Sequence, residues 1–188
     1  GFVIGETHYV AKGYAGYFPE RLVSNPGARW PMSSNIAYRK DVFDKVGLFD
    51  DFFYHYNNED SELAIRAVAF GFSYVREPSA QVIHQKMEWS AKSLLRSARN
   101  AAVWPVLKKK YPDHFAVFGP PVKFGILVNA EDYFYFLALP LLIPLLFIRY
   151  LLHGKKDLKI FFLKWPVWLM MRRQYIYRES YKQRIFMI

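Results

Sequence analysis

The chain has 188 residues, no cysteine and a formal net charge of +10, with 53% hydrophobic and 19% aromatic residues. Its length suits one domain with an appendage, and the lack of cysteine excludes disulfide bridges, thiolate zinc sites and cysteine nucleophiles. Such an apolar, aromatic and basic composition is typical neither of a disordered tail nor of an ordinary soluble domain, and it indicates membrane contact.

The positive charge is concentrated at the C-terminal end. Residues 149–188 contain 10 Lys and Arg against 2 acidic residues, so most of the net charge belongs to this tail. The first residues lack the basic start and apolar run of a signal peptide, and the chain does not begin with Met. We therefore expect it to begin within a longer protein.

Residues 1–115 mix short apolar runs with Gly, Pro and Asn, as is typical of a compact α/β unit. A short strand is expected at 36–38, followed by a helix over 39–46. Gly47 should end this helix, because glycine readily adopts the left-handed conformation found at helix C-termini.

A second helix is expected after an aromatic, polar loop, DDFFYHYNN. It begins near Asp60, carries apolar residues on one face and ends at Gly71. Two strands should follow, at 72–76 and 80–84, separated by a turn at 77–79.

A long helix is expected over about 90–110. Pro105 should kink or interrupt it, because proline lacks the backbone N–H that a helix interior needs. Residues 116–132 are then a linker. Residues 133–152 are apolar with a single charge, which suits a bilayer span, although a buried core helix is the alternative.

The basic tail alternates apolar patches with cations. Residues 160–171 are too short and interrupted for a second span and better fit a segment in the membrane interface, bound to anionic lipid. A nucleic-acid-binding tail is the weaker alternative. The region 133–188 is thus predicted to be membrane-associated, with no nucleic acid as partner.

Three carboxylates occupy four residues at the expected start of the second helix, in the octet EDSELAIR: Glu59, Asp60 and Glu62. Alone, the octet indicates a capped helix, because Asn58, Asp60 and Ser61 are good N-caps and acids in a first turn favour the helix dipole. A catalytic site is the alternative.

The octet belongs to a longer ordered set of residues that extends across residues 30–84. They are Asn35, Arg39, Gly47-Leu48-Phe49-Asp50, Glu59-Asp60, Leu63, Arg66, Gly71, Pro78 and His84. This set resembles the C-terminal half of the catalytic domain of family-two glycosyltransferases, which are inverting enzymes with a GT-A-type fold. The resemblance covers about a third of the chain. It implies an α/β fold: a partial GT-A-type domain, the acceptor-side half, in residues 1–115.

The resemblance also implies roles for the acidic residues. Asp60 matches the base that takes the proton from an acceptor hydroxyl during inverting sugar transfer. Glu59 is then expected to position the acceptor or brace the site, the aromatic loop to form a sugar-binding wall, and Glu62 to face solvent.

Five further residues are expected at the substrate-binding site: Trp30, Ser34, Asn35, Arg66 and Arg99. For Arg66 a structural ion pair with the acidic loop is favoured over substrate contact. The pair Arg99-Asn100, also found in many relatives, either clamps phosphate or serves packing.

His84 at the end of a strand would by itself more often be structural. The resemblance favours a metal ligand or a contact with the diphosphate of the donor. The cofactor implied is a divalent metal, Mg²⁺ or Mn²⁺, held mainly by a donor-side half with an Asp-x-Asp motif, and no Asp-x-Asp occurs in this chain. We therefore expect the chain alone to be incomplete and inactive.

The predicted function is transfer of a sugar from a nucleotide-sugar donor to a hydroxyl of a glycan or lipid-linked acceptor, with Asp60 as base. Because such donors are cytoplasmic, the catalytic part is expected to face the cytoplasm from the plasma membrane. The alternative is a non-catalytic membrane-anchoring or assembly module whose tail binds anionic lipid.

Overall fold

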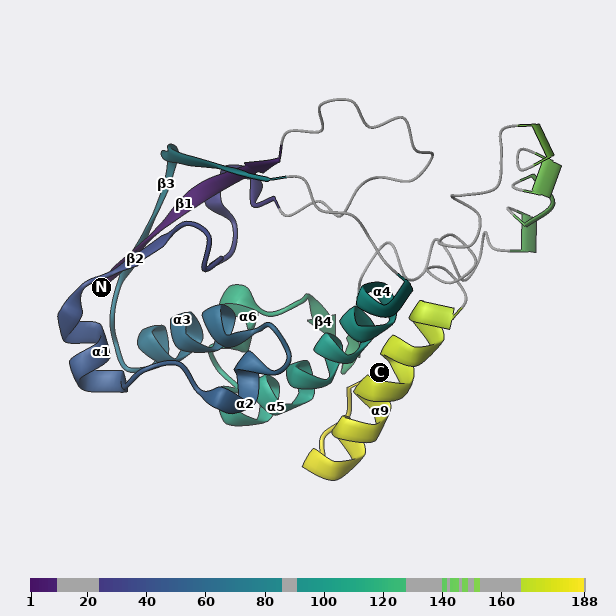
Figure 1. Cartoon of the computed structure of the whole chain (residues 1–188). Coiled ribbons are helices and arrows are strands. Elements are labelled where there is room, and N and C mark those ends of the chain that lie inside the picture. Colours follow the sequence, from purple (N-terminus) through teal and green to yellow (C-terminus); the bar gives the residue numbers. More distant parts are fainter. Residues whose placement is uncertain are drawn as a thin grey trace.

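The computed structural model shows a small α/β domain in which a three-stranded sheet lies against a group of helices (Figure 1). The residues it describes are 1–9, 24–85, 91–127, 140–141, 143–145, 147–148, 151–152 and 167–187.

The sheet is mixed, with the order β2-β1-β3. The central strand β1 (Phe2–Tyr9) pairs antiparallel with β2 (Ile36–Tyr38), which confirms the strand expected at 36–38. It pairs in parallel with β3 (Tyr74–His84), so both strands end at the same edge of the sheet, with Tyr9 opposite His84.

The prediction of two strands separated by a turn at 77–79 is wrong, because β3 is continuous. The turn residues are present as an irregularity in the ladder instead: Gly5 of β1 is opposite Glu77, but the next residue, Glu6, is opposite Gln81. Pro78 lies within this irregularity, where its missing N–H interrupts no regular pairing.

The side chain of Asn35 bridges the interrupted part of the ladder. Its amide nitrogen donates to the carbonyl of Glu6 on β1 (2.9 Å) and to that of Ala80 on β3 (2.7 Å). Gly5 allows this approach, since a Cβ there would lie 2.3 Å from the Asn35 amide nitrogen. Asn35 thus links β1 to β3 at the point where the ladder shifts register.

Two predicted helices are confirmed with their glycine ends. Helix α1 (Lys40–Val46) is followed by Gly47 with φ 83°, and α3 (Glu59–Ala69) ends two residues before Gly71 with φ 103°. Both angles lie in the left-handed region that glycine enters without a Cβ clash.

The helix predicted over 90–110 is divided in three. Helix α4 (Ala91–Ala98), the 3₁₀ helix η2 (Arg99–Ala102) and α5 (Val103–Lys110) follow one another. Pro105 lies in the first turn of α5, where the N–H that proline lacks has no intrahelical partner. The smaller elements are η1 (Pro26–Ala28), α2 (Asp51–Tyr54), α6 (Phe115–Phe118), β4 (Val122–Lys123) and β5 (Ile126–Leu127).

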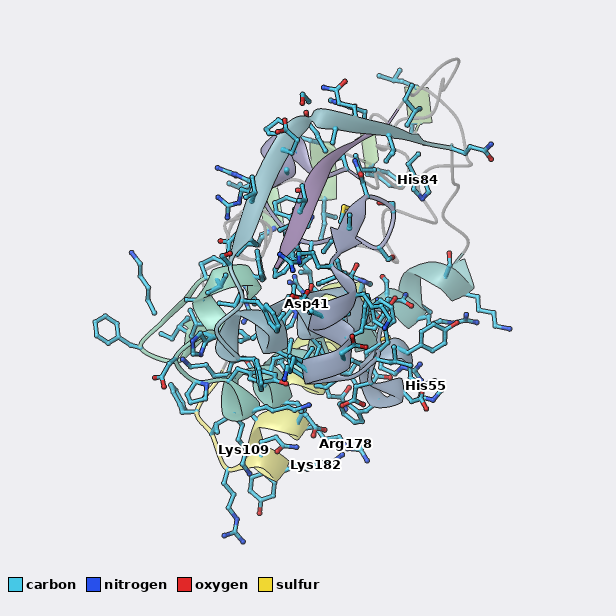
Figure 2. The ribbon with its side chains drawn as sticks, turned by 90° about the vertical axis from the view of Figure 1, so that its left-hand side faces the viewer. Asp41, His55, His84, Lys109, Arg178 and Lys182 are labelled. Carbon is cyan, nitrogen blue, oxygen red and sulfur yellow. The ribbon has the colours of Figure 1, made fainter. Side chains whose placement is uncertain are left out.

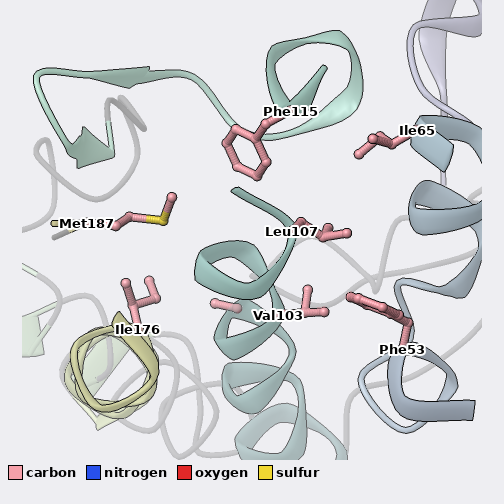
Figure 3. Close-up of a cluster of buried hydrophobic side chains, with 8 residues drawn as sticks. Phe53, Ile65, Val103, Leu107, Phe115, Ile176 and Met187 are labelled. Atoms are coloured by element: carbon pink, nitrogen blue, oxygen red, sulfur yellow. The ribbon is translucent and has the colours of Figure 1, made fainter. Parts of the chain in front are cut away.

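Helix α3 is packed between two cores. Its Ala64 and Ala67 face the sheet, where they contact a cluster that includes Phe2 and Ile4. Its Ile65 belongs to a second cluster, formed among the helices. Figure 3 shows this second cluster, with Phe53, Ile65, Val103, Leu107, Phe115, Ile176 and Met187 converging from different segments. Contact on two sides fixes the direction in which the first turn of α3 points.

The predicted fold, a partial GT-A-type domain followed by membrane helices over 133–188, is corrected. The tail contains helix α9 (Leu169–Gln183), which packs against α4, η2 and α5 (Figure 1). Leu169 and Ile176 are buried, as is Met187 beyond the helix. These three apolar residues of the tail therefore complete the core of the domain.

The predicted span over 133–152 falls partly outside the described residues, as do residues 160–166 of the predicted interfacial segment. In the described part of the chain, no helix has the length and apolar character needed to cross a bilayer.

Candidate functional site

The carboxylate of Asp60 is held in the first turn of α3 by two backbone N–H groups. Oδ2 accepts a hydrogen bond from the Ser33 amide (3.1 Å), and Oδ1 accepts one from Ser61 (2.7 Å). The N-cap residue, Asn58, makes no side-chain cap and donates instead to the carbonyls of Tyr56 and Asn100. The octet thus begins a helix, and the carboxylate of Asp60 is also bound from outside that helix.

Burial raises the pKa of Asp60 to about 6. The two N–H groups act against this shift by stabilising the charged form, and the neighbouring charge of Glu59 adds to it. A carboxylate with a pKa near 6 is ionised at neutral pH yet accepts a proton more readily than an ordinary aspartate. This is the property required of a general base.

Glu59 supplies a second carboxylate beside Asp60. Its Oε2 is shielded from solvent and has no hydrogen-bond partner among the described residues. A shielded oxygen without a partner costs free energy unless something else satisfies it. The charge of Glu59 also adds to the negative charge at the first turn of α3.

Glu62 does not face solvent as expected; its side chain is fully buried. It accepts hydrogen bonds from Arg66 Nη2 (2.8 Å), Lys110 Nζ (3.0 Å) and the Tyr111 hydroxyl (2.7 Å). The sequence does not predict the contacts of Lys110 and Tyr111. Lys110 ends a run of three lysines and Tyr111 follows it, and neither position signals a buried partner.

Arg66 is occupied by protein groups. Besides Glu62, its guanidinium donates to the carbonyls of Val46 (2.5 Å) and Leu48 (2.8 Å). It therefore ties α3 to the end of α1 and to the segment that follows, and the contacts seen are those of a structural brace.

Trp30, Ser34 and Asn35 lie on the segment that brings Ser33 to Asp60. The Trp30 ring is 40% exposed, while its backbone N–H and carbonyl both bond to the Asn25 side chain. The Ser34 hydroxyl bonds to that of Thr7 (3.0 Å). Of the three, Trp30 presents its side chain most freely.

Residues 48–56, hereafter the aromatic segment, immediately precede α3. Its side chains Phe49, Phe52 and Tyr54 are largely exposed. Arg99 donates to the carbonyl of His55 (3.2 Å) and lies over the Tyr56 ring, 5.4 Å from its centre. Arg99 thus contacts both the backbone and one ring of the aromatic segment.

His84 lies at the end of β3, well apart from His55 of the aromatic segment (Figure 2). Its Nδ1 is 2.8 Å from the carbonyl of Gln85. Among the residues that the structure describes, no group of three or more His, Asp or Glu side chains is close enough to hold a metal ion. These residues do not by themselves fit the predicted metal, and no chemical step is derived through it.

Comparison with known proteins gives one partial similarity. The chain is 29% identical over 92 residues to chondroitin synthase of Pasteurella multocida strain Pm70, a match that covers 49% of this chain and 9% of that protein. No protein-family model matches, and no solved structure matches significantly. The similarity supports a glycosyltransferase-like chain and gives no detail of mechanism or substrate.

Proposed function

We propose that this chain is the acceptor-binding part of an inverting glycosyltransferase in which Asp60 is the general base. The observation that carries the proposal is the environment of Asp60: a carboxylate oriented by two backbone N–H groups, with a pKa of about 6. The partial similarity to a chondroitin synthase supports the reaction class.

In the proposed reaction, the oxygen of an acceptor hydroxyl attacks the anomeric carbon of a nucleotide-sugar. The new glycosidic C–O bond forms as the bond from that carbon to the diphosphate oxygen breaks, and the diphosphate leaves with the electron pair. The hydroxyl proton passes to the carboxylate of Asp60. Glu59 keeps this region negative, which favours protonation of its neighbour.

The exposed aromatic rings beside α3 are suited to bind the acceptor. Trp30 lies on the segment that bonds to Asp60 through Ser33, and Phe52 and Tyr54 belong to α2, which packs against α3. Rings of this kind offer an apolar face to the C–H surface of a sugar and, for Tyr and Trp, a hydrogen-bonding edge.

The test compares the protein with its Asp60→Asn variant, each assayed within the full-length enzyme that supplies the donor-side half. Transfer is measured from a panel of nucleotide-sugars to oligosaccharides, chondroitin oligosaccharides first because of the relative. Removal of the base should lower turnover by about 10²- to 10⁴-fold. The control is Asp44→Asn, the same change at an exposed carboxylate of α1 that pairs with Lys40. Turnover of Asp60→Asn close to that of the control would refute the proposal.

A further inference from the structure

We propose that Glu62 and Lys110 are positioning residues for the acceptor, which hold the exposed rings of the aromatic segment in place beside α3. The inference rests on the proposed function for the identity of the ligand. It assigns a role to two residues that neither the sequence pattern nor the proposed chemistry uses.

The first observation is the buried carboxylate itself. Glu62 is fully buried two residues after Asp60, and its oxygens are satisfied by Arg66, Lys110 and Tyr111. Partial burial lowers the pKa of Lys110, but the hydrogen bond to Glu62 and its charge outweigh this, so the pKa is raised overall. The ammonium is thus held in its charged form against α3.

The second observation is that Lys110 also reaches the aromatic segment. Its Nζ lies 3.3 Å from Oδ2 of Asp50 and 5.1 Å from the centre of the Phe53 ring. The other oxygen of Asp50 caps α2 by accepting from the Phe52 amide (3.0 Å). One lysine therefore joins the buried carboxylate of α3 to the first turn of α2.

The third observation is that the aromatic segment is tied at further points while several of its rings stay partly exposed. Arg66 binds the carbonyl of Leu48, and Arg99 binds the carbonyl of His55. Between these ties Phe49, Phe52 and Tyr54 expose 45%, 43% and 63% of their surface. Several partly exposed rings in one short segment offer an apolar surface to a ligand.

Position, more than stability, is the advantage that this arrangement offers. A buried ion pair adds little stability over apolar side chains of similar volume, because desolvation offsets the attraction. It does constrain distance and direction, because the partly exposed ammonium of Lys110 contacts both the buried Glu62 and Asp50. Fixed rings lower the ordering cost of binding an acceptor.

The test uses Lys110→Met, which keeps much of the side-chain stem and removes the charge. The control is Lys109→Met, the same change at an exposed neighbour that lies toward the end of the molecule with Arg178 and Lys182 (Figure 2). Lys110→Met should raise the acceptor KM about tenfold and leave kcat within about twofold, because ring placement changes while Asp60 does not. The control should change neither.

Asp50→Asn is the second variant, because its amide oxygen still caps α2 while the charge that Lys110 contacts is lost. It should raise KM in the same direction, and the double variant should show less than the product of the two single effects, since both changes break one contact. Unfolding by urea shows whether each variant is folded at the assay temperature.

A binding measurement separates this inference from the proposed function. Titration calorimetry with the chondroitin oligosaccharide and no donor should show about tenfold weaker binding for Lys110→Met than for Lys109→Met. Equal affinity in folded variants, or no binding by the unmodified protein, would overturn the inference whatever Asp60→Asn does. Normal turnover by Asp60→Asn would instead overturn the proposed base and leave the binding result to stand.

Discussion

The backbone amide of Ser33 donates a 3.1 Å hydrogen bond to Oδ2 of Asp60, a residue 27 positions later. This bond joins the segment before β2 to the first turn of α3. It uses an N–H that belongs to no helix or strand, so its geometry depends on the docking of that segment. The carboxylate is thereby oriented from two directions, by Ser33 and by its own neighbour Ser61.

The pH dependence of transfer should report the pKa of Asp60. Only the ionised carboxylate accepts a proton, so the rate should fall about tenfold for each pH unit below about 6 and level off above it. The measurement is kcat/KM for the acceptor between pH 4.5 and 8, with donor saturating. A rate that is constant down to pH about 4.5 would contradict the raised pKa.

Asp60→Asn should also make the protein more stable at pH 7.5. The pKa of Asp60 rises from 3.8 to about 6 on folding, so the stability it contributes is present below pH about 4 and is lost as the pH rises through 6. Above pH 6 the half-buried charge is a cost, which the amide removes. The amide has one oxygen for the two N–H groups of Ser33 and Ser61, so we expect a net gain of only about 1 kcal/mol. Urea unfolding at pH 7.5 and 4.5 checks this, since the gain should be smaller at the lower pH.

The elements marked by local signals could be predicted from the sequence. Helices α1 and α3 are each followed by a glycine that adopts positive φ, and α3 has apolar residues at helical spacing. The helix start that carries Asp60 is also a local feature, whereas the role of base is assigned to Asp60 from the family resemblance. The continuity of β3 could not be predicted, because at its register shift the two strands are linked by the side chain of Asn35, which comes from a distant segment.

Glu62 shows why contacts between distant segments remained hidden. A glutamate in a first turn is ordinarily solvated, and nothing near it in the sequence indicates that Lys110 and Tyr111 will pack over it. The prediction of membrane helices in the tail is wrong for a related reason. Its apolar residues are interrupted by cations, as in an interfacial helix, but Arg172 is itself buried between the rings of Trp104 and Trp168.

Asn35→Ala should destabilise the sheet. The change removes the amide that donates to the carbonyls of Glu6 and Ala80. We expect a loss of about 2 kcal/mol in the free energy of unfolding. Asn35→Asp should cost more, because a carboxylate would face two carbonyl oxygens. Equal stability of all three proteins in urea would show that the bridge contributes nothing.

Ile176→Ala should reveal whether α9 completes the core. Ile176 is fully buried among Val103, Leu107 and Met187, so its truncation leaves a cavity and should lower the free energy of unfolding by about 2–4 kcal/mol. The adjacent residue gives the matched control: Tyr177 is 48% exposed, and Tyr177→Ala should change stability by less than about 1 kcal/mol. Urea unfolding in the absence of lipid or detergent measures both. Because the expected loss arises inside the domain, it should appear without any membrane, and an unchanged midpoint for Ile176→Ala would mean that the tail does not pack as described.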